Sequence, residues 1–169
     1  HDALPISKKN TWLSRNYQAL NVNYNIYFNA NESYKQGLER IRQNNVDDYS
    51  EVLNMYPISN HDNASVASGD MERAIKKTQT AIKKRSIRKR PKKNAQKARN
   101  NEKYREWLTQ EEFNPAMYKA WMLLGKAQFH STDFLAAVAT FSYIIKHFDE
   151  NADAVAEAKL WMAHSYAEM

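Results

Sequence analysis

The residues best suited to bind a ligand are a run of Lys and Arg near the middle of the chain, which could bind anions. Between Lys83 and Arg105 there are 12 Lys or Arg residues and one acid, Glu102, a local charge of +11. The remaining chain has 13 basic and 18 acidic residues, so the net charge of +6 arises from this one segment. Such cations can neutralise phosphates, and Tyr104 and Trp107 could stack on bases. The residues expected to make these contacts are Lys83, Lys84, Arg85, Arg88, Lys89, Arg90, Lys92 and Lys93.

Three observations favour a simpler interpretation, in which residues 83–112 are a solvated, partly disordered basic insertion. The segment has no aromatic residue until its end, it joins two predicted helical regions, and the rest of the chain is net negative. Like charges repel one another and keep such a run in solvent. The next alternative is contact with acidic lipid headgroups or lipopolysaccharide, because polybasic segments gain affinity at anionic surfaces. An acidic protein partner ranks below that, and a nucleic acid is the least expected.

No other pattern in the sequence predicts catalysis or a metal site. The five His residues are scattered, and none forms the i, i+4 pair with Glu that a zinc-binding helix needs. Three Gly residues cannot build a phosphate-binding loop, and the sequence has no Cys to supply disulfides or thiolate ligands. The adjacent acids Asp47–Asp48 and Glu111–Glu112 are interpreted as solvated surface, because neighbouring side chains diverge. We therefore expect no catalytic residue, no cofactor, no metal and no enzymatic activity.

The elements that must position any site are expected to be helices. Only 3 Gly and 4 Pro occur in 169 residues, too few for many turns, which predicts an all-α fold. Thr11 is a candidate N-cap, and apolar residues then recur at spacings of three and four, with a break near Asn29. This spacing predicts one buried helix face. Its members are Leu13, Tyr17, Leu20, Tyr24, Tyr27, Asn31, Tyr34, Leu38 and Ile41.

The next part of the chain alternates between irregular and helical patterns. Residues 44–70 are rich in Asn, Asp and Ser, and we expect Val52, Leu53, Met55 and Tyr56 to pack this loop onto the helices. Asp70 is expected to cap a helix whose apolar pattern aligns residues 70–85 with residues 133–148. Residues 8–82 are therefore predicted to be a degenerate repeat, in which this helix pairs with the Tyr-rich one.

The C-terminal part predicts a helical hairpin followed by the start of another helix. Asn114 before Pro115 is typical of a helix start, and the segments His130–Asp133 and Asp149–Asn151 are expected to be turns. The order of large, Leu-Gly, Ala and Phe residues resembles the tetratricopeptide pattern. Small side chains would let neighbouring helices approach closely. The predicted packing residues are Trp121, Leu124, Gly125, Ala137, Phe141 and Ala163, which lies 38 positions after Gly125.

Four longer segments extend this resemblance to residues 8–169. They are NTWLSRNYQALNVNYNIYFNANESYKQGLE, DDYSEVLNMYPIS, AWMLLGKAQFHSTDFLAAVATFSYI and AEAKLWMAHSYAEM. In this order they resemble the N-terminal part of large tetratricopeptide outer-membrane lipoproteins of Bacteroidota, whose relatives with known roles serve gliding motility and type IX protein secretion. The resemblance implies a lipoprotein at the outer membrane that faces the periplasm. Members of that family usually have a lipidated Cys just before the position of SKKNT, where this sequence has none.

By repeat position, the first helix of each pair should line a concave groove that holds a protein partner. The groove residues expected on this basis are Lys119, Met122, Lys126, Phe129, His130, Leu160 and His164. Met122 and Phe129 would offer apolar contact, and the two Lys residues could hold a carboxylate. The alternative is that Met122 and Phe129 only pack on the neighbouring repeat.

The sequence thus divides into four parts. Residues 1–7 are expected to be a non-native or disordered leader, because HDALPI can be encoded by DNA that resembles a sequencing-adapter tail. Residues 8–82 form the degenerate repeat region, residues 83–112 the basic insertion, and residues 113–169 one tetratricopeptide repeat plus the first helix of the next, cut in mid-helix at Met169. The function expected is a non-enzymatic scaffold for protein–protein contact, and the alternative is an anionic-surface binding module formed by residues 83–105.

Overall fold

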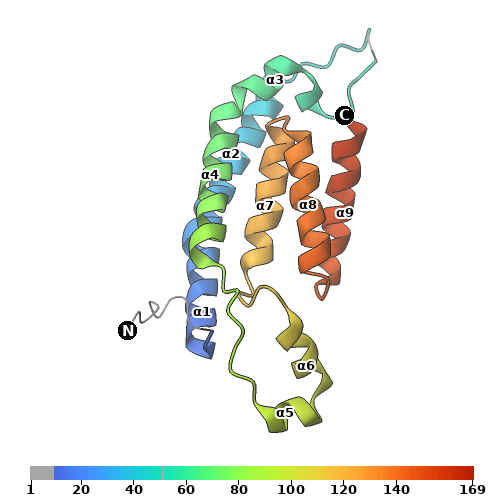
Figure 1. Cartoon of the computed structure of the whole chain (residues 1–169). Coiled ribbons are helices and arrows are strands. Elements are labelled where there is room, and N and C mark those ends of the chain that lie inside the picture. Colours follow the sequence, from blue (N-terminus) through green and yellow to red (C-terminus); the bar gives the residue numbers. More distant parts are fainter. Residues whose placement is uncertain (1–9, 51) are drawn as a thin grey trace.

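The computed structural model describes residues 10–50 and 52–169, and the predicted leader, residues 1–7, lies outside them. Within these ranges the regular elements are helices and there is no strand, so the all-α prediction is confirmed. The longer helices run alternately up and down and pack each against the next along the chain (Figure 1).

A single rod of three consecutive elements forms the N-terminal part. These are α1 (Trp12–Asn21), the π-helical turn η2 (Val22–Tyr27) and α2 (Phe28–Asn44). Thr11 caps α1 as predicted, because its side chain accepts a hydrogen bond from the backbone N–H of Ser14 at 3.2 Å.

The π-helical turn changes which side of the rod faces the core. A π-helix has more residues per turn than an α-helix, so the buried positions before it are not the ones that α-helical spacing predicts. Ser14, Gln18 and Val22 are buried, at intervals of four, and after the turn the buried set includes Tyr34 and Ile41.

The predicted buried face of the first helix is therefore wrong in its first half. Its first four members, Leu13, Tyr17, Leu20 and Tyr24, lie on the solvent side of the rod. Tyr34 and Ile41 are buried as expected, and Tyr27 and Leu38 are partly buried.

A loop and two short helices lead from α2 to the next long helix. The loop contains η3 (Pro57–Ser59) and α3 (His61–Val66), and α4 (Ser68–Arg85) then returns antiparallel to α2 (Figure 1). The prediction that the loop packs through four apolar residues is correct only for Tyr56, because Val52, Leu53 and Met55 are exposed. α2 and α4 approach closely at Gly37, where an added Cβ would lie 2.6 Å from Met71 Cε.

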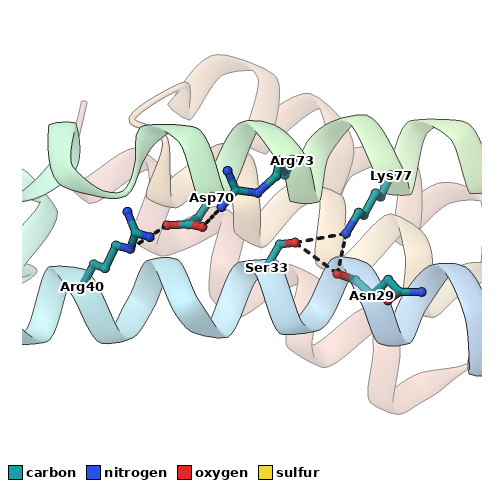
Figure 2. A network of polar contacts seen from close by, with 6 residues as sticks. All are labelled: Asn29, Ser33, Arg40, Asp70, Arg73 and Lys77. Carbon is teal, nitrogen blue, oxygen red and sulfur yellow. Dashed lines mark hydrogen bonds and ion pairs between the residues drawn. The ribbon is translucent and has the colours of Figure 1, made fainter.

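Asp70 does not cap α4 but lies buried between α4 and α2. The N-cap position is Ala67, which has no side-chain capping bond. The Asp70 carboxylate pairs with Arg73 in its own helix and with Arg40 of α2, whose Nε lies 3.1 Å from Oδ2 (Figure 2). The Arg40 contact is an ion pair rather than an aligned hydrogen bond. One turn further along, Lys77 donates to the carbonyl of Asn29 and to Ser33 Oγ, at 3.1 and 3.3 Å (Figure 2).

The C-terminal helices are α7 (Met117–His130), α8 (Phe134–His147) and α9 (Ala152–Ala167). Their turns fall where the sequence predicts them, and the side chains of Asp133 and Asn151 cap α8 and α9. α7 starts slightly later than expected, because Asn114 holds the turn that precedes it by accepting from the N–H of Ala116 at 3.1 Å. α7 packs mainly on α4 and α8, and it also contacts α2 and η2 on one side and α9 on the other.

The basic insertion contains two short helices, α5 (Ala95–Asn100) and α6 (Glu102–Thr109), and projects from the end of the bundle where α1 begins (Figure 1). Most side chains of these helices are exposed, as expected for a solvated segment, and both helices are regular where partial disorder was expected. Lys83, Lys84 and Arg85 belong to the last turn of α4 rather than to the insertion.

The two ends of the insertion meet in a buried clasp. Ile87 and Phe113 are buried, and the N–H of Phe113 donates to the carbonyl of Ile87 at 2.9 Å. One carboxylate oxygen of Glu112 accepts from the backbone N–H groups of Ile87 and Asn114, both at 2.8 Å. Glu112 is therefore a structural residue, and its interpretation as solvated surface is wrong.

Substitution of Gly125 tests the close approach of α7 and α8. An added Cβ would lie 2.5 Å from Phe141 Cε1, and Phe141 is fully buried. Overpacking costs about 1–3 kcal/mol, which exceeds the gain of about 1 kcal/mol in helix propensity from Gly to Ala. We expect Gly125→Ala to lower the free energy of unfolding measured in urea. The control Gly69→Ala should not, because there the nearest neighbour is an Arg73 nitrogen at 3.7 Å; equal effects of the two variants would refute this account.

Asp70→Asn tests the buried carboxylate between α2 and α4. The change keeps the side-chain size and removes the charge that Arg40 and Arg73 share. A hydrogen bond to a charged group contributes about 1.5–3 kcal/mol, and the partly exposed Arg side chains place the expected loss near the lower limit. The measurement is the urea unfolding midpoint at low and high salt. Asp62→Asn, at an exposed acid, is the control, and an Asp70 variant as stable as this control would contradict the assignment.

Candidate functional site

Phe129, predicted to line a partner groove, is instead the centre of a buried aromatic cluster. Its ring makes edge contacts with Tyr56, Phe134 and Trp161, at centroid distances of 5.2, 5.4 and 5.3 Å. These neighbours come from the loop before α3, from α8 and from α9. Phe129 therefore fastens the loop and the last three helices together and has no surface to offer a partner.

His130 and Met122 are also buried, so the groove prediction is wrong for three of its seven residues. His130 Nδ1 donates to the carbonyl of Lys126 at 2.9 Å, since a carbonyl oxygen can only accept, and Tyr34 Oη lies 3.3 Å from the same nitrogen. Burial lowers the pKa of His130 to about 4 and raises the pKa of Tyr34. The contact between Tyr34 and His130 joins α2 to α7. For Met122 and Phe129, the alternative of packing on the neighbouring helices therefore describes the structure better than a partner groove does.

The other four predicted groove residues reach the surface. Lys119 Nζ donates to Asn23 Oδ1 at 3.3 Å, and Lys126 forms an ion pair with Glu157 of α9. His164 Nδ1 and Tyr56 Oη form a hydrogen bond of 2.5 Å, and Leu160 is exposed. Three of the four side chains are thus already engaged within the chain.

The predicted packing residues lie where expected, with one exception. Leu124, Gly125, Ala137 and Phe141 are buried, and Trp121 stacks on Tyr143 with a centroid distance of 4.1 Å. Ala163 is exposed, so the close approach expected there is wrong. The face of α9 that packs against its neighbours instead presents Ala154, Ala158 and Ser165.

An exposed apolar stripe on the first rod is the most unusual surface in the described residues. Six large apolar side chains of α1, η2 and α2 are each 55–73% exposed, while the polar residues Ser14 and Gln18 face the core. Gln18 accepts a hydrogen bond from Arg85 at 3.2 Å. The stripe consists of Trp12, Leu13, Tyr17, Leu20, Tyr24 and Phe28. Sequence reasoning singled out four of them but placed them in the core, and it missed Trp12 and Phe28.

The basic segment borders a pocket of about 890 Å³ between the start of α1 and the insertion. Arg88, Lys89, Arg90, Lys92 and Lys93 lie exposed in the connection before α5, and Lys89, Arg90 and Lys92 line the pocket. Lys83 and Lys84 are exposed on α4 outside it, and Arg85 is half-buried against Gln18. Only part of the predicted basic segment therefore gathers around one cavity.

Comparison with known proteins does not identify a family for this chain. A scan against protein-family models finds no match to the chain, and a search of curated proteins finds none with significant similarity. The resemblance to the tetratricopeptide lipoproteins therefore stays a prediction. The described residues contain no group of His, Cys, Asp and Glu that could hold a metal ion. Within the same ranges, no helix has both the length and the apolar content that a membrane crossing requires.

Burial of His130 predicts a loss of stability in mild acid. Above pH 6.5 the ring is neutral in the folded and the unfolded state. As the pH falls from 6.5 toward 4, the unfolded chain binds a proton that the folded protein does not, so the free energy of unfolding decreases. Between pH 7 and pH 5 the expected decrease is about 2 kcal/mol.

Urea unfolding across this pH range, in the protein and in His130→Asn, measures the effect. The Asn side chain can still donate to the Lys126 carbonyl but does not titrate, so this variant should lose the pH-dependent part. His61→Asn, at an exposed histidine, should leave it unchanged. Parallel pH profiles for the protein and His130→Asn would contradict the prediction.

Proposed function

We propose that this chain is a non-enzymatic helical scaffold that binds another protein through the apolar stripe of its first rod. The observation behind the proposal is the inverted polarity of α1, with polar side chains inside and large apolar ones outside. Burying one large apolar side chain contributes about 1.5–3 kcal/mol. Six such side chains remain in contact with water along one rod, and a partner that buried them would gain this free energy on binding.

The composition of the stripe fits a protein partner. Trp and Tyr are enriched where a few residues supply most of the binding energy, and the stripe contains Trp12, Tyr17 and Tyr24. Large apolar patches on a protein surface are typical of protein–protein contact sites. The rigidity of the rod also helps, because a preorganised surface loses little conformational freedom on binding.

A tetratricopeptide-like stack is the finer architecture that we propose for this scaffold. Two hairpins, α2 with α4 and α7 with α8, are followed by α9, and α7 touches both α2 and α9. The first helix of each hairpin has a glycine where the second helix approaches, Gly37 and Gly125. Repeats that stack in this way form extended binding surfaces. Placement at the outer membrane, in secretion or gliding-type machinery, is part of the proposal and rests on the sequence resemblance alone.

Capture by photo-crosslinking tests the stripe. A photoreactive amino acid at Leu20 should crosslink a partner in the cells that produce the protein, and the same group at Gln36, an exposed polar position of α2, should not. Fractionation of the crosslinked cells then shows whether the adduct sediments with the outer membrane.

Substitutions show whether the captured protein depends on the stripe. In chains that carry the photoreactive group at Leu20, Tyr17→Glu with Tyr24→Glu should reduce capture at least about tenfold, because hot-spot substitutions cost about 2 kcal/mol or more. The matched pair Gln36→Glu with Thr80→Glu adds the same charge at exposed sites elsewhere and should leave capture intact. Both variants should unfold as the parent does, since exposed substitutions change stability by about 0.5 kcal/mol or less. Equal capture by both would refute the proposal.

A further inference from the structure

The pocket beside α1 combines a high positive charge with a concave shape. Arg15 of α1 faces it from one side, and Lys89, Arg90, Lys92, Lys97 and Lys103 of the insertion surround the rest. None of the residues that line it is acidic. Within the described residues, no ion pair joins any of these six cations to an acid. Cations concentrated around a cleft focus the electrostatic field and attract anions into it.

Aromatic rings hold two of these cations at the pocket. The Arg15 guanidinium lies 4.9 Å from the ring centroid of Trp107, and Lys97 Nζ lies 4.9 Å from that of Tyr104. The two rings stack on each other with a centroid distance of 5.6 Å. Arg15 also donates to Asn10 Oδ1 at 2.5 Å, and Asn10 donates to the carbonyl of Lys89 at 2.7 Å. The pocket wall is therefore preorganised across segments that are distant in the sequence.

The start of α1 adds a free aromatic surface. Trp12 lines the same pocket and is 69% exposed, so its ring is open to a stacking partner. This supplies the aromatic component that the basic segment lacks in the sequence. Thr11 and Asn101, the N-cap residues of α1 and α6, also line the pocket, which brings the positive ends of two helix dipoles to it.

The pocket and the apolar stripe share Trp12, but the other stripe residues of α1 point away from Arg15. Arg15 is two residues from both Leu13 and Tyr17, which corresponds to a rotation of about 200° around an α-helix. These side chains therefore project to opposite sides of α1. A flat anionic membrane that contacted Arg15 could not also contact Leu13 and Tyr17, which argues against a lipid surface as the ligand.

We propose that the pocket binds nucleotides, with phosphates among the cations and a base stacked on Trp12. The ligand is either a free nucleotide or a nucleotide unit of a single-stranded nucleic acid, and the two share this chemistry. The volume of about 890 Å³ exceeds the need of a phosphate ion alone, and six cations exceed the charge of one phosphate. The pocket shares Trp12 with the protein-binding stripe, whereas its six cations belong to the pocket alone.

Binding to the full chain is measured by isothermal titration at about 50 mM salt, where phosphate contacts are strong. The probes are ATP, inorganic tripolyphosphate, adenosine and an oligodeoxythymidine of about eight nucleotides. ATP or the oligonucleotide should bind at least about tenfold more tightly than tripolyphosphate, since stacking one base contributes about 1–3 kcal/mol. If the oligonucleotide binds more tightly than ATP, the ligand is a single-stranded nucleic acid. If ATP binds as tightly as the oligonucleotide, the ligand is a free nucleotide.

Two variants place the binding in this pocket. Arg90→Ala with Lys92→Ala should weaken nucleotide binding about tenfold or more, whereas Lys83→Ala with Lys84→Ala should change it less than about twofold. Both pairs remove two exposed cations of the same basic segment, but only the first pair lines the pocket. Trp12→Ala should remove the preference for ATP over tripolyphosphate and leave tripolyphosphate binding unchanged.

Several outcomes would overturn the proposal. Absence of nucleotide binding at low salt would do so, and so would equal losses in the two cation variants, which would indicate non-specific charge. Unaltered preference in Trp12→Ala would exclude the stacked base. Tighter binding of polyglutamate or of phosphatidylglycerol vesicles than of any nucleotide would assign the pocket to an acidic protein or to a membrane. All three variants alter exposed residues, and their urea unfolding curves confirm that the fold is retained.

Discussion

The π-helical turn Val22–Tyr27 determines which side of the first rod faces the core. An α-helix that continued without it would place Leu20 within about 60° of Tyr34 and Ile41 around the axis, and Ser14 about 180° from Ile41. The turn rotates the two halves relative to each other, so the core contacts Ser14 and Gln18 before it, Val22 at its start, and Tyr34 and Ile41 after it. The solvent exposure of Leu20 in the apolar stripe follows from this rotation.

Phe129 and His130 have the complementary role inside the bundle. They join the loop before α3, the second half of the rod, α7, α8 and α9 through ring contacts and hydrogen bonds. A surface that supplies so many internal contacts cannot also bind a partner without rearrangement. The two binding sites that we propose therefore use the outside of the rod and the pocket at its end, and Trp12 belongs to both.

Much of the fold is predictable because it follows from local signals. Sparse Gly and Pro, the turns at His130–Asp133 and Asp149–Asn151, and the small residue Gly125 each predict their structure from neighbours in the sequence. Asp70 and Glu112 are not predictable in this way, because Arg40 and the Ile87 N–H reach them from distant segments. The pocket is a similar case, since Trp12 and the cations of the insertion meet only in the folded chain. The face of α1 was mispredicted because α-helical spacing does not hold across a π-helical turn.

The clasp formed by Ile87, Glu112 and Phe113 has a consequence for how this chain can vary. The segment that leaves α4 and the segment that enters α7 are hydrogen-bonded to each other, so the end of α4 and the start of α7 are held together at this point. Residues 88–111 then form a module whose two ends are joined by these hydrogen bonds. The length and sequence of this module can change, or the module can be replaced by another helical hairpin, while the bundle of α2, α4, α7, α8 and α9 keeps its shape.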